Sequence, residues 1–174
     1  HGDHRVLHSS PPRRSSDRRP SRTFKRLGSR SGAVYAEPAR EAAHGRLADV
    51  AVALGGDKPS DSYLVIERIL AAARETGAQA IYPGYGFLSE SAAFAEACEA
   101  AGIAFIGPTA EQIREFGLKH RARELAAQAK VPLTPGTGLL ADIDQAPTEA
   151  ERIGYPVMPK STAGGGGLGP PAGP

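Results

Sequence analysis

Apolar side chains recur along residues 22–115 with two alternating periods. Four short apolar runs, each flanked by glycine or proline, predict buried strands. These runs lie near residues 33–36, 50–54, 80–82 and 103–106. Three other stretches carry apolar residues at every third or fourth position, which predicts helices. They are residues 62–76, 90–101 and 109–115. Strands that alternate with helices about every 20 residues are typical of βαβ units, so we expect an α/β fold with a parallel sheet.

Residues before the predicted helices supply the expected N-terminal caps. Ser60 or Asp61 is expected to cap the first helix, and Ser89 the second. Thr109 and Gln112 have the spacing of a capping box for the third.

The pattern continues after residue 116. Leucine and alanine at helical spacing predict a helix near 118–129, and residues 144–153 are also predicted to be helical. Residues 156–160 are strand-like. Loop segments that follow strands are of interest because ligands of parallel sheets bind beyond the carboxyl ends of the strands.

Residues 1–21 differ from the rest in composition. They are rich in Ser, Pro and Arg and have no apolar period, so we expect a disordered tail. Residues 1–30 hold eight Arg and one Lys against two Asp, a net charge of +7, whereas the remaining residues carry a net charge of −5. The basic character therefore belongs to the tail, which argues against a body that binds nucleic acid.

The single Cys98 excludes an internal disulfide and fits a reducing compartment, so we expect a cytoplasmic protein. No apolar run approaches the roughly 18 residues of a membrane span, and no signal peptide is apparent. We therefore expect no membrane partner.

Three motifs carry candidate chemistry. The first, YPGYGFLSES at residues 82–91, places two glycines around an aromatic residue, which allows an unusual backbone path. The same residues also fit a plain turn between a strand and a helix. The second, FGLKH at residues 116–120, places Lys119 near a helix start, where it can reach a phosphate with the helix amides. A solvated lysine is the alternative.

The third motif is Lys160 followed by a glycine-rich loop, KSTAGGGGLG at residues 160–169. Glycines let backbone N–H groups close over phosphates, and a lysine neutralises their charge. It is not a P-loop, in which the lysine follows the glycines. A flexible linker is the alternative.

Together these motifs resemble the biotin carboxylases. YPGYGFLSES is similar to their HPGYGFLSEN signature, and IGYPVMPKSTAGGGGLG resembles the strand, lysine and glycine-rich lid of their ATP-grasp domain. The resemblance covers about residues 22–169. FGLKH followed by ARELA, and KSTAGGGG after GYPVM, most resemble urea carboxylase and the carboxylase half of urea amidolyase.

The resemblance implies a domain plan. Residues 22–115 would form the Rossmann-like preATP-grasp domain, and residues 116–174 the beginning of the ATP-grasp domain with its glycine-rich lid. The chain would then be a fragment that stops before the catalytic residues and Mg²⁺ ligands of the family, so that it contains no catalytic or metal-binding residue and is inactive alone.

The resemblance also implies a reaction. ATP would activate bicarbonate as carboxyphosphate, and the carboxyl group would pass to biotin on a separate carrier domain. Lys119 and Lys160 would bind the ATP phosphates, and Gly164, Gly165, Gly166 and Gly167 would form the lid. Implied partners are the carrier and carboxyltransferase regions of the full enzyme, which would be a homo-oligomer.

Two departures from the family stand out. Where the family has a strand and loop like LIANRGEIA, this chain has LHSSPPRR at residues 7–14, as a GC-rich gene would encode after a shift of reading frame. A chain of this sequence is expected to lack the first, central strand of its sheet. Pro159 replaces an aliphatic residue in the strand before Lys160 and removes a backbone donor there.

Three other functions stay open on the sequence. The chain also fits another ATP-grasp ligase. The rest of the ATP-grasp fold, which lies beyond this sequence, would distinguish such a ligase from a biotin carboxylase. This chain also fits a non-catalytic interaction protein with an arginine-rich arm, which would bind DNA or RNA in a salt-dependent way. The third alternative is a nonfunctional gene product.

Overall fold

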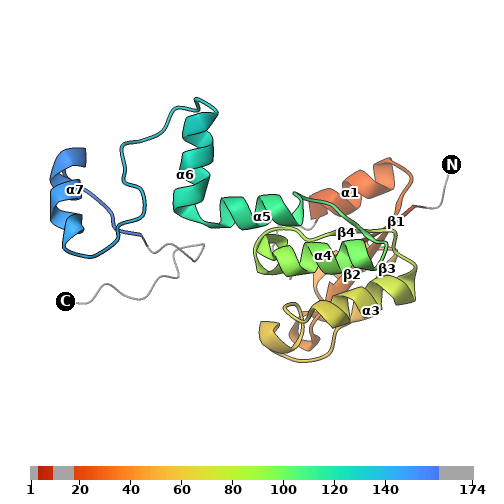
Figure 1. Ribbon diagram of the computed structural model, residues 1–174. Helices are drawn as coiled ribbons and strands as arrows, with labels where there is room; N and C mark the ends of the chain where they lie inside the picture. Colours follow the sequence, from red (N-terminus) through yellow and green to blue (C-terminus); the bar gives the residue numbers. More distant parts are fainter. Residues whose placement is uncertain (1–3, 10–17, 161–174) are drawn as a thin grey trace. The chain divides into compact units, whose positions relative to one another are not determined.

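The computed structural model describes residues 4–9 and 18–160, and its contacts divide the chain into two compact units, residues 1–110 and 111–174. The first unit contains five strands (Figure 1). They are β1 (Arg5–His8), β2 (Arg30–Tyr35), β3 (Val50–Ala53), β4 (Ala80–Tyr82) and β5 (Ala104–Phe105). Its helices are α1 (Arg18–Arg26), α2 (Ala43–Leu47), α3 (Ile66–Thr76) and α4 (Ala92–Ala100).

The five strands form one parallel sheet in the order β3-β2-β1-β4-β5. Leu7 of β1 pairs with Gly32 on one side and with Ile81 on the other. Because parallel crossovers are right-handed, α1 and α2, which contact each other, cover one face of the sheet. The helices α3 and α4 contact each other on the opposite face. The predicted α/β class with a parallel sheet is confirmed, and the strand order reverses between β1 and β4, the place in doubly wound sheets beyond whose carboxyl ends ligands bind.

The prediction of a disordered segment over residues 1–21 is wrong where the structure describes it. Arg5–His8 is the central strand β1, with Val6 and Leu7 buried, and α1 begins at Arg18. The expected loss of the central strand is therefore also wrong. Two apolar residues give no detectable period, but pairing to strands on both sides buries them and satisfies their backbone. Residues 1–3 and 10–17, which the prediction also covers, lie outside the described residues.

Strands β2, β3, β4 and β5 lie within two or three residues of their predicted bounds. The helix α3 begins at Ile66, later than expected, because residues 59–61 form a short 3-10 turn. In that turn the Asp61 carboxylate accepts the backbone N–H of Lys58 at 2.8 Å. The cap of α4 is Ser91, whose hydroxyl accepts the N–H of Phe94 at 3.2 Å, and not Ser89 as predicted. Ser89 instead lies inside a 3-10 turn, Phe87–Glu90.

The second unit consists of helices, of which the first two are separated by one residue and the last two by a long loop. They are α5 (Ala110–Gly117), α6 (Lys119–Gln128) and α7 (Gln145–Ile153). The strand predicted over residues 156–160 does not form in the described part of this unit. Pro156 and Pro159 lack backbone N–H groups, which weakens any ladder that this segment could build. Over residues 4–9 and 18–160, no helix has the length and apolar character needed to cross a membrane.

Candidate nucleotide-binding site

The motif at residues 82–91 lies at the carboxyl edge of the sheet, directly after β4. Gly84 and Gly86 have φ angles of 70° and 71°, in the left-handed region that glycine enters without strain. Phe87 follows with a φ of 51°, which is unusual for a residue with a bulky side chain. The loop leaves Tyr85 64% exposed. The predicted unusual backbone path is present, and it projects an aromatic ring from the edge where ligands bind.

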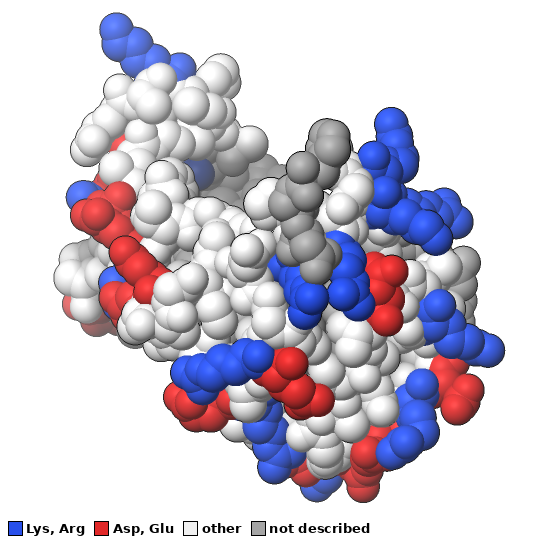
Figure 2. Space-filling view, turned by 90° about the vertical axis from the view of Figure 1, so that its right-hand side faces the viewer, with Lys and Arg blue, Asp and Glu red and all other residues white. Residues whose placement is uncertain are grey.

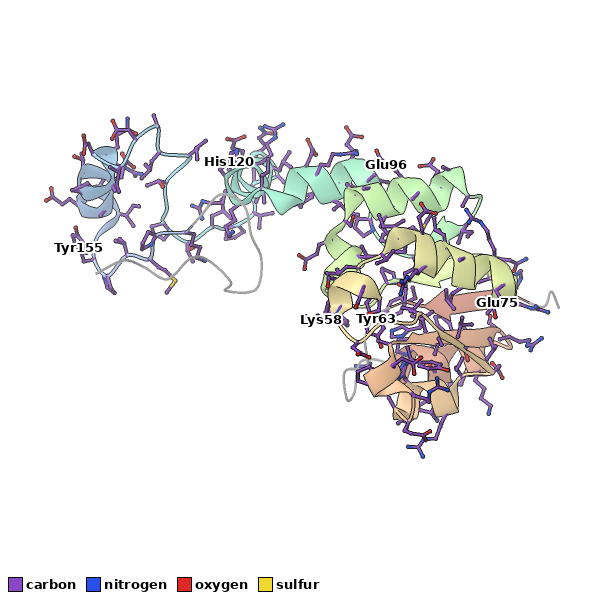
Figure 3. All side chains as sticks on the ribbon, turned by 90° about the horizontal axis from the view of Figure 1, so that it is seen from below. Lys58, Tyr63, Glu75, Glu96, His120 and Tyr155 are labelled. Atoms are coloured by element: carbon purple, nitrogen blue, oxygen red, sulfur yellow. The ribbon has the colours of Figure 1, made fainter. Side chains whose placement is uncertain are left out.

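Aromatic and aliphatic side chains of the core pack against this loop and hold it in place. Leu88 belongs to the core, and Phe87 packs against it with its ring centroid 6.4 Å from that of Tyr63. The Tyr63 hydroxyl accepts the backbone N–H of Ala36 at 2.9 Å, so the same ring ties this loop to the end of β2 (Figure 3). At the neighbouring strand end, His8 stacks on Tyr82 with 5.4 Å between ring centroids. The residues at this edge are therefore held in place by the core.

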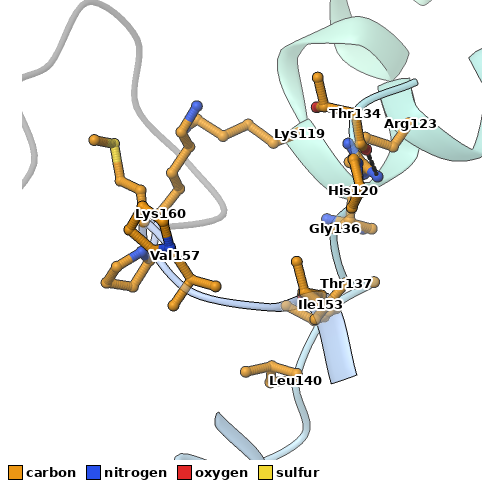
Figure 4. A pocket seen from close by; sticks show the side chains of 16 residues that line it. Lys119, His120, Arg123, Thr134, Gly136, Thr137, Leu140, Ile153, Val157 and Lys160 are labelled. Atoms are coloured by element: carbon orange, nitrogen blue, oxygen red, sulfur yellow. Dashed lines mark hydrogen bonds between the residues drawn. The ribbon is translucent and has the colours of Figure 1, made fainter. Parts of the chain in front are cut away.

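The second unit holds a separate cavity of about 580 Å³, which both predicted phosphate-binding lysines line (Figure 4). Lys119 lies at the first position of α6, and Lys160 lies on the segment after α7 that forms the facing wall. The loop of residues 134–140 closes the remaining side. The two lysines are 41 positions apart in the sequence, and the fold of this unit brings them to one cavity.

Hydrogen bonds hold the wall of this cavity. The guanidinium of Arg123 donates to the carbonyl of Thr134 at 3.0 Å, which joins α6 to the loop. Arg152 of α7 donates to the carbonyl of Gly136 at 3.4 Å and to the Glu149 carboxylate at 2.7 Å. The hydrogen bond between Arg152 and Glu149 is the main reason why the pKa of Glu149 is lowered and the pKa of Arg152 is raised.

Sequence reasoning missed two residues of the cavity wall. Arg123 lies four positions after Lys119, so helical spacing alone could have placed it on the same face of α6. His120 also lines the cavity, and its Nδ1 atom is buried without a hydrogen-bond partner among the residues that the structure describes. His120 belongs to the FGLKH motif, but only Lys119 of that motif was given a role.

The cavity suits an anion. Its lining includes Lys119, Arg123 and Lys160, and no Asp or Glu side chain contributes to its described wall. Positive groups around a cavity of this size can neutralise the phosphates of a nucleotide. Mg²⁺ requires oxygen ligands, so these residues do not fit the metal, and the described ranges contain no group of three acidic, His or Cys side chains that could hold one. Gly164, Gly165, Gly166 and Gly167 lie outside the described residues.

The fold and cavity define a doubly wound α/β unit followed by a unit with a basic, nucleotide-sized cavity. The family described as "Biotin carboxylase, N-terminal domain" matches residues 13–113, and "Carbamoyl-phosphate synthase L chain, ATP binding domain" matches residues 119–171. The chain belongs to the biotin carboxylase N-terminal domain family.

Similar proteins agree with this assignment. The chain is 53% identical over 148 residues to a urea amidolyase from Lachancea kluyveri, a match that covers 85% of this chain and 8% of the relative. It is 46% identical over 149 residues to biotin carboxylase 1 from Bacillus subtilis, covering 85% and 33%. The crystal structure of the Kluyveromyces lactis urea amidolyase matches with a TM-score of 0.71 and 48% identity, covering 76% of this chain and 8% of the other.

A biotin carboxylase from Campylobacter jejuni, crystallised as a β,γ-ATP complex, matches with a TM-score of 0.85 and 40% identity. That match covers 94% of this chain and 36% of the other. The chain thus spans a third or less of the length of the curated relatives named above.

Proposed function

We propose that this chain is the N-terminal part of an ATP- and bicarbonate-dependent biotin carboxylase that works within a urea carboxylase. The observation that carries this proposal is the order of the two family matches, the biotin carboxylase domain first and the ATP-binding domain directly after it. The 53% identity to a urea amidolyase supports urea as the final carboxyl acceptor. The cytoplasm is the proposed location.

Lys119 and Lys160 are proposed to bind the phosphates of ATP, because both line the basic cavity of the second unit. Gly164, Gly165, Gly166 and Gly167 are proposed to form a lid over the nucleotide, since they follow Lys160 directly in the sequence. In this arrangement both lysines act by electrostatic attraction and neither transfers a proton. Arg123 adds a third positive charge to the same wall.

The remaining chemistry is proposed to come from outside these 174 residues. The absence of acidic side chains from the described cavity wall means that the Mg²⁺ ligands must be supplied elsewhere. Biotin would be carried on a separate domain, and a carboxyltransferase region would pass the carboxyl group onward. A homo-oligomer of the full enzyme remains part of the proposal.

A chimera tests the function directly. Residues 22–160 would replace the matching segment of the Lachancea kluyveri urea amidolyase, and urea- and bicarbonate-dependent release of ADP would be measured. We expect the chimera to retain this activity. Loss of activity in a folded chimera would contradict the proposal.

The lysines are tested in the same chimera. Lys119→Gln and Lys160→Gln each remove a charge-assisted contact worth about 1.5–3 kcal/mol, so we expect roughly a ten- to hundredfold loss in ATP binding or turnover. The matched control is Lys130→Gln, an exposed lysine that does not line the cavity. Equal effects from all three substitutions would show that Lys119 and Lys160 have no special role.

The 174-residue chain alone is expected to bind Mg-ATP weakly or not at all, because its cavity lacks metal ligands. Isothermal titration measures this. Micromolar affinity would contradict the proposal that the nucleotide site is completed elsewhere.

A further inference from the structure

The helix α1 has two chemically opposite faces. Ser21 is buried and Phe24 is half-buried, and both lie on the side that packs on the sheet. Arg19, Arg22 and Arg26 are exposed and have the i, i+3, i+7 spacing of one helix face. Lys25 is exposed beside them. We call these four residues the basic face of α1.

The charges of the basic face are not balanced within the described part of the protein. The side chains of Arg19, Arg22 and Arg26 have no hydrogen bond or ion pair with any residue in the described ranges, and α1 contains no acidic residue. Lys25 and Arg30 lie near Asp49, but the carboxylate of Asp49 already accepts the backbone N–H of Ser31 at 2.7 Å.

Part of this arrangement works against the helix itself. Like charges three or four residues apart repel, and Arg19 lies in the first turn, where the helix dipole disfavours a positive charge, although Lys25 and Arg26 lie in the last turn, where the dipole favours one. Two other partly exposed arginines, Arg40 and Arg121, do have local acidic partners, Glu37 and Glu124. Among the described residues, the basic face has no acidic partner that matches its charge.

The surroundings of α1 limit what that anion can be. Residues 31–110 carry ten acidic and five basic side chains, a net charge of −5, so the positive charge of the first unit is concentrated in residues 1–30, which include the basic face. Figure 2 views the side of the molecule that includes the N-terminal part of the chain, and Lys and Arg outnumber Asp and Glu over its upper right part. From Arg19 to Arg26 the helix rises only about 10 Å.

A nucleic acid is long and uniformly charged, so it would place many phosphates against the acidic remainder of the unit. A short acidic polypeptide can place a few carboxylates on the arginines and keep the rest of its charge low. The apolar side of α1 is packed on the sheet and is not available for insertion into a membrane.

We propose that the basic face of α1 is a docking surface for an acidic polypeptide segment with carboxylates spaced to match Arg19, Arg22 and Arg26. The surface is independent of the nucleotide cavity, and its test does not depend on carboxylase activity.

The test uses the full 174-residue chain and two fluorescein-labelled probes, a decaglutamate peptide and a 12-base-pair DNA duplex. Binding is followed by fluorescence anisotropy at about 50 and 200 mM salt. We expect the peptide to bind at low salt, to bind more tightly than the duplex, and to weaken at higher salt. Failure of the peptide to bind at low salt, or tighter binding of the duplex, would overturn the proposal.

Matched variants locate the surface. The triple variant Arg19→Gln, Arg22→Gln and Arg26→Gln is expected to weaken peptide binding at least tenfold. The control triple, Arg40→Gln, Arg74→Gln and Arg114→Gln, removes the same charge from exposed positions elsewhere and is expected to change it less than twofold. Equal losses would show a general effect of net charge and would overturn the proposal.

A third variant separates binding from folding. Replacing the same three arginines of α1 by lysine keeps the charge, so the variant is expected to bind the peptide within about threefold of the parent. Circular dichroism of each variant shows whether α1 and the sheet are retained. If the lysine variant is folded but binds the peptide as weakly as the glutamine variant, the positive charge of the surface does not determine binding, and the proposal fails.

Discussion

The two units of this protein differ in where their apolar side chains lie. In the first unit, strands and helices enclose a core in which Leu7, Val34, Ile81 and Phe94 are fully buried. In the second unit, α6 and α7 contain no buried residue, and Leu139, Ile143 and Met158 are 62%, 85% and 79% exposed. Burial of apolar area is the main stabilising contribution to folding. The first unit therefore carries most of the stability, whereas the second holds the candidate nucleotide cavity in a more open structure.

The strongest test of this contrast compares two leucines. Leu7→Ala removes a side chain that is 0% exposed in the central strand, so we expect it to lower the free energy of unfolding by about 2–5 kcal/mol. Leu139→Ala removes a side chain that is 62% exposed and should change that free energy by less than about 0.5 kcal/mol. Urea denaturation followed by circular dichroism measures both. Similar losses would show that the second unit is as well packed as the first.

A pair of glycines tests how tightly the loops of the first unit are built. Gly56 has a φ of 75°, and a Cβ atom there would lie 2.7 Å from the carbonyl oxygen of Asp61. We expect Gly56→Ala to destabilise the protein by about 1–3 kcal/mol. Gly102 has a similar φ of 69° but nothing within 4 Å of the added atom, so Gly102→Ala should cost less. The difference between the losses of unfolding free energy in the two variants measures the cost of the steric clash at Gly56. Equal losses would mean that the loop at Gly56 moves to accommodate the added methyl group.

The single cysteine and the single methionine report on the two units separately. Burial raises the pKa of the Cys98 thiol to about 11, which leaves little thiolate at pH 8. We expect iodoacetamide to modify Cys98 slowly until urea unfolds the first unit. Met158 is 79% exposed and should be oxidised by dilute peroxide without unfolding. Mass spectrometry follows both reactions, and rapid labelling of Cys98 in the native protein would contradict the contrast.

The smallest expected effect concerns pH. The backbone N–H of Ser31 is the main cause of the lowered pKa of Asp49, with the Ser31 hydroxyl adding to it at 3.0 Å. A lowered pKa in the folded state gives stability that is present above the unfolded value of about 3.9 and is lost as pH falls through the folded pKa. The Asp49→Asn variant should therefore be slightly less stable than the parent at pH 7, and the difference should vanish in acid. A difference that persists at low pH would point to packing instead.

Sequence patterns predicted the three described helices of the second unit within two residues of their observed bounds, whereas they missed β1 and α2 of the first unit. The strands β2 to β5 were predicted because their apolar runs are bounded by glycine or proline, and α4 because Phe94 and Cys98 recur at helical spacing. The strand β1 was missed, since its stability comes from pairing with β2 and β4 and not from its own composition. The segment at residues 156–160 was predicted as a strand from local composition, but it has no pairing partner among the described residues.

The candidate site shows the same limit. Lys119 and Lys160 were singled out from two separate motifs, and both line one cavity. Their role in binding phosphate stays a prediction. Arg123 and His120 lie in quoted motifs but were given no role, because a charged or polar residue within a helix has no distinguishing pattern until the fold shows which loop it faces. Motifs identify residues whose chemistry depends on their neighbours in the sequence, whereas cavity walls depend on contacts across the fold.

The position of β1 in the middle of the sheet has a consequence for how the chain folds as it is synthesised. Leu7 leaves the ribosome before Gly32, and Ile81 emerges later still, so the two edges of β1 find their partners at different times. Until β4 has been made, the β4-facing edge of β1 has unpaired backbone groups next to the apolar side chains of Val6 and Leu7. Exposed strand edges of this kind favour pairing with other chains. During synthesis the half-built sheet is therefore a natural target for chaperones that recognise short apolar segments.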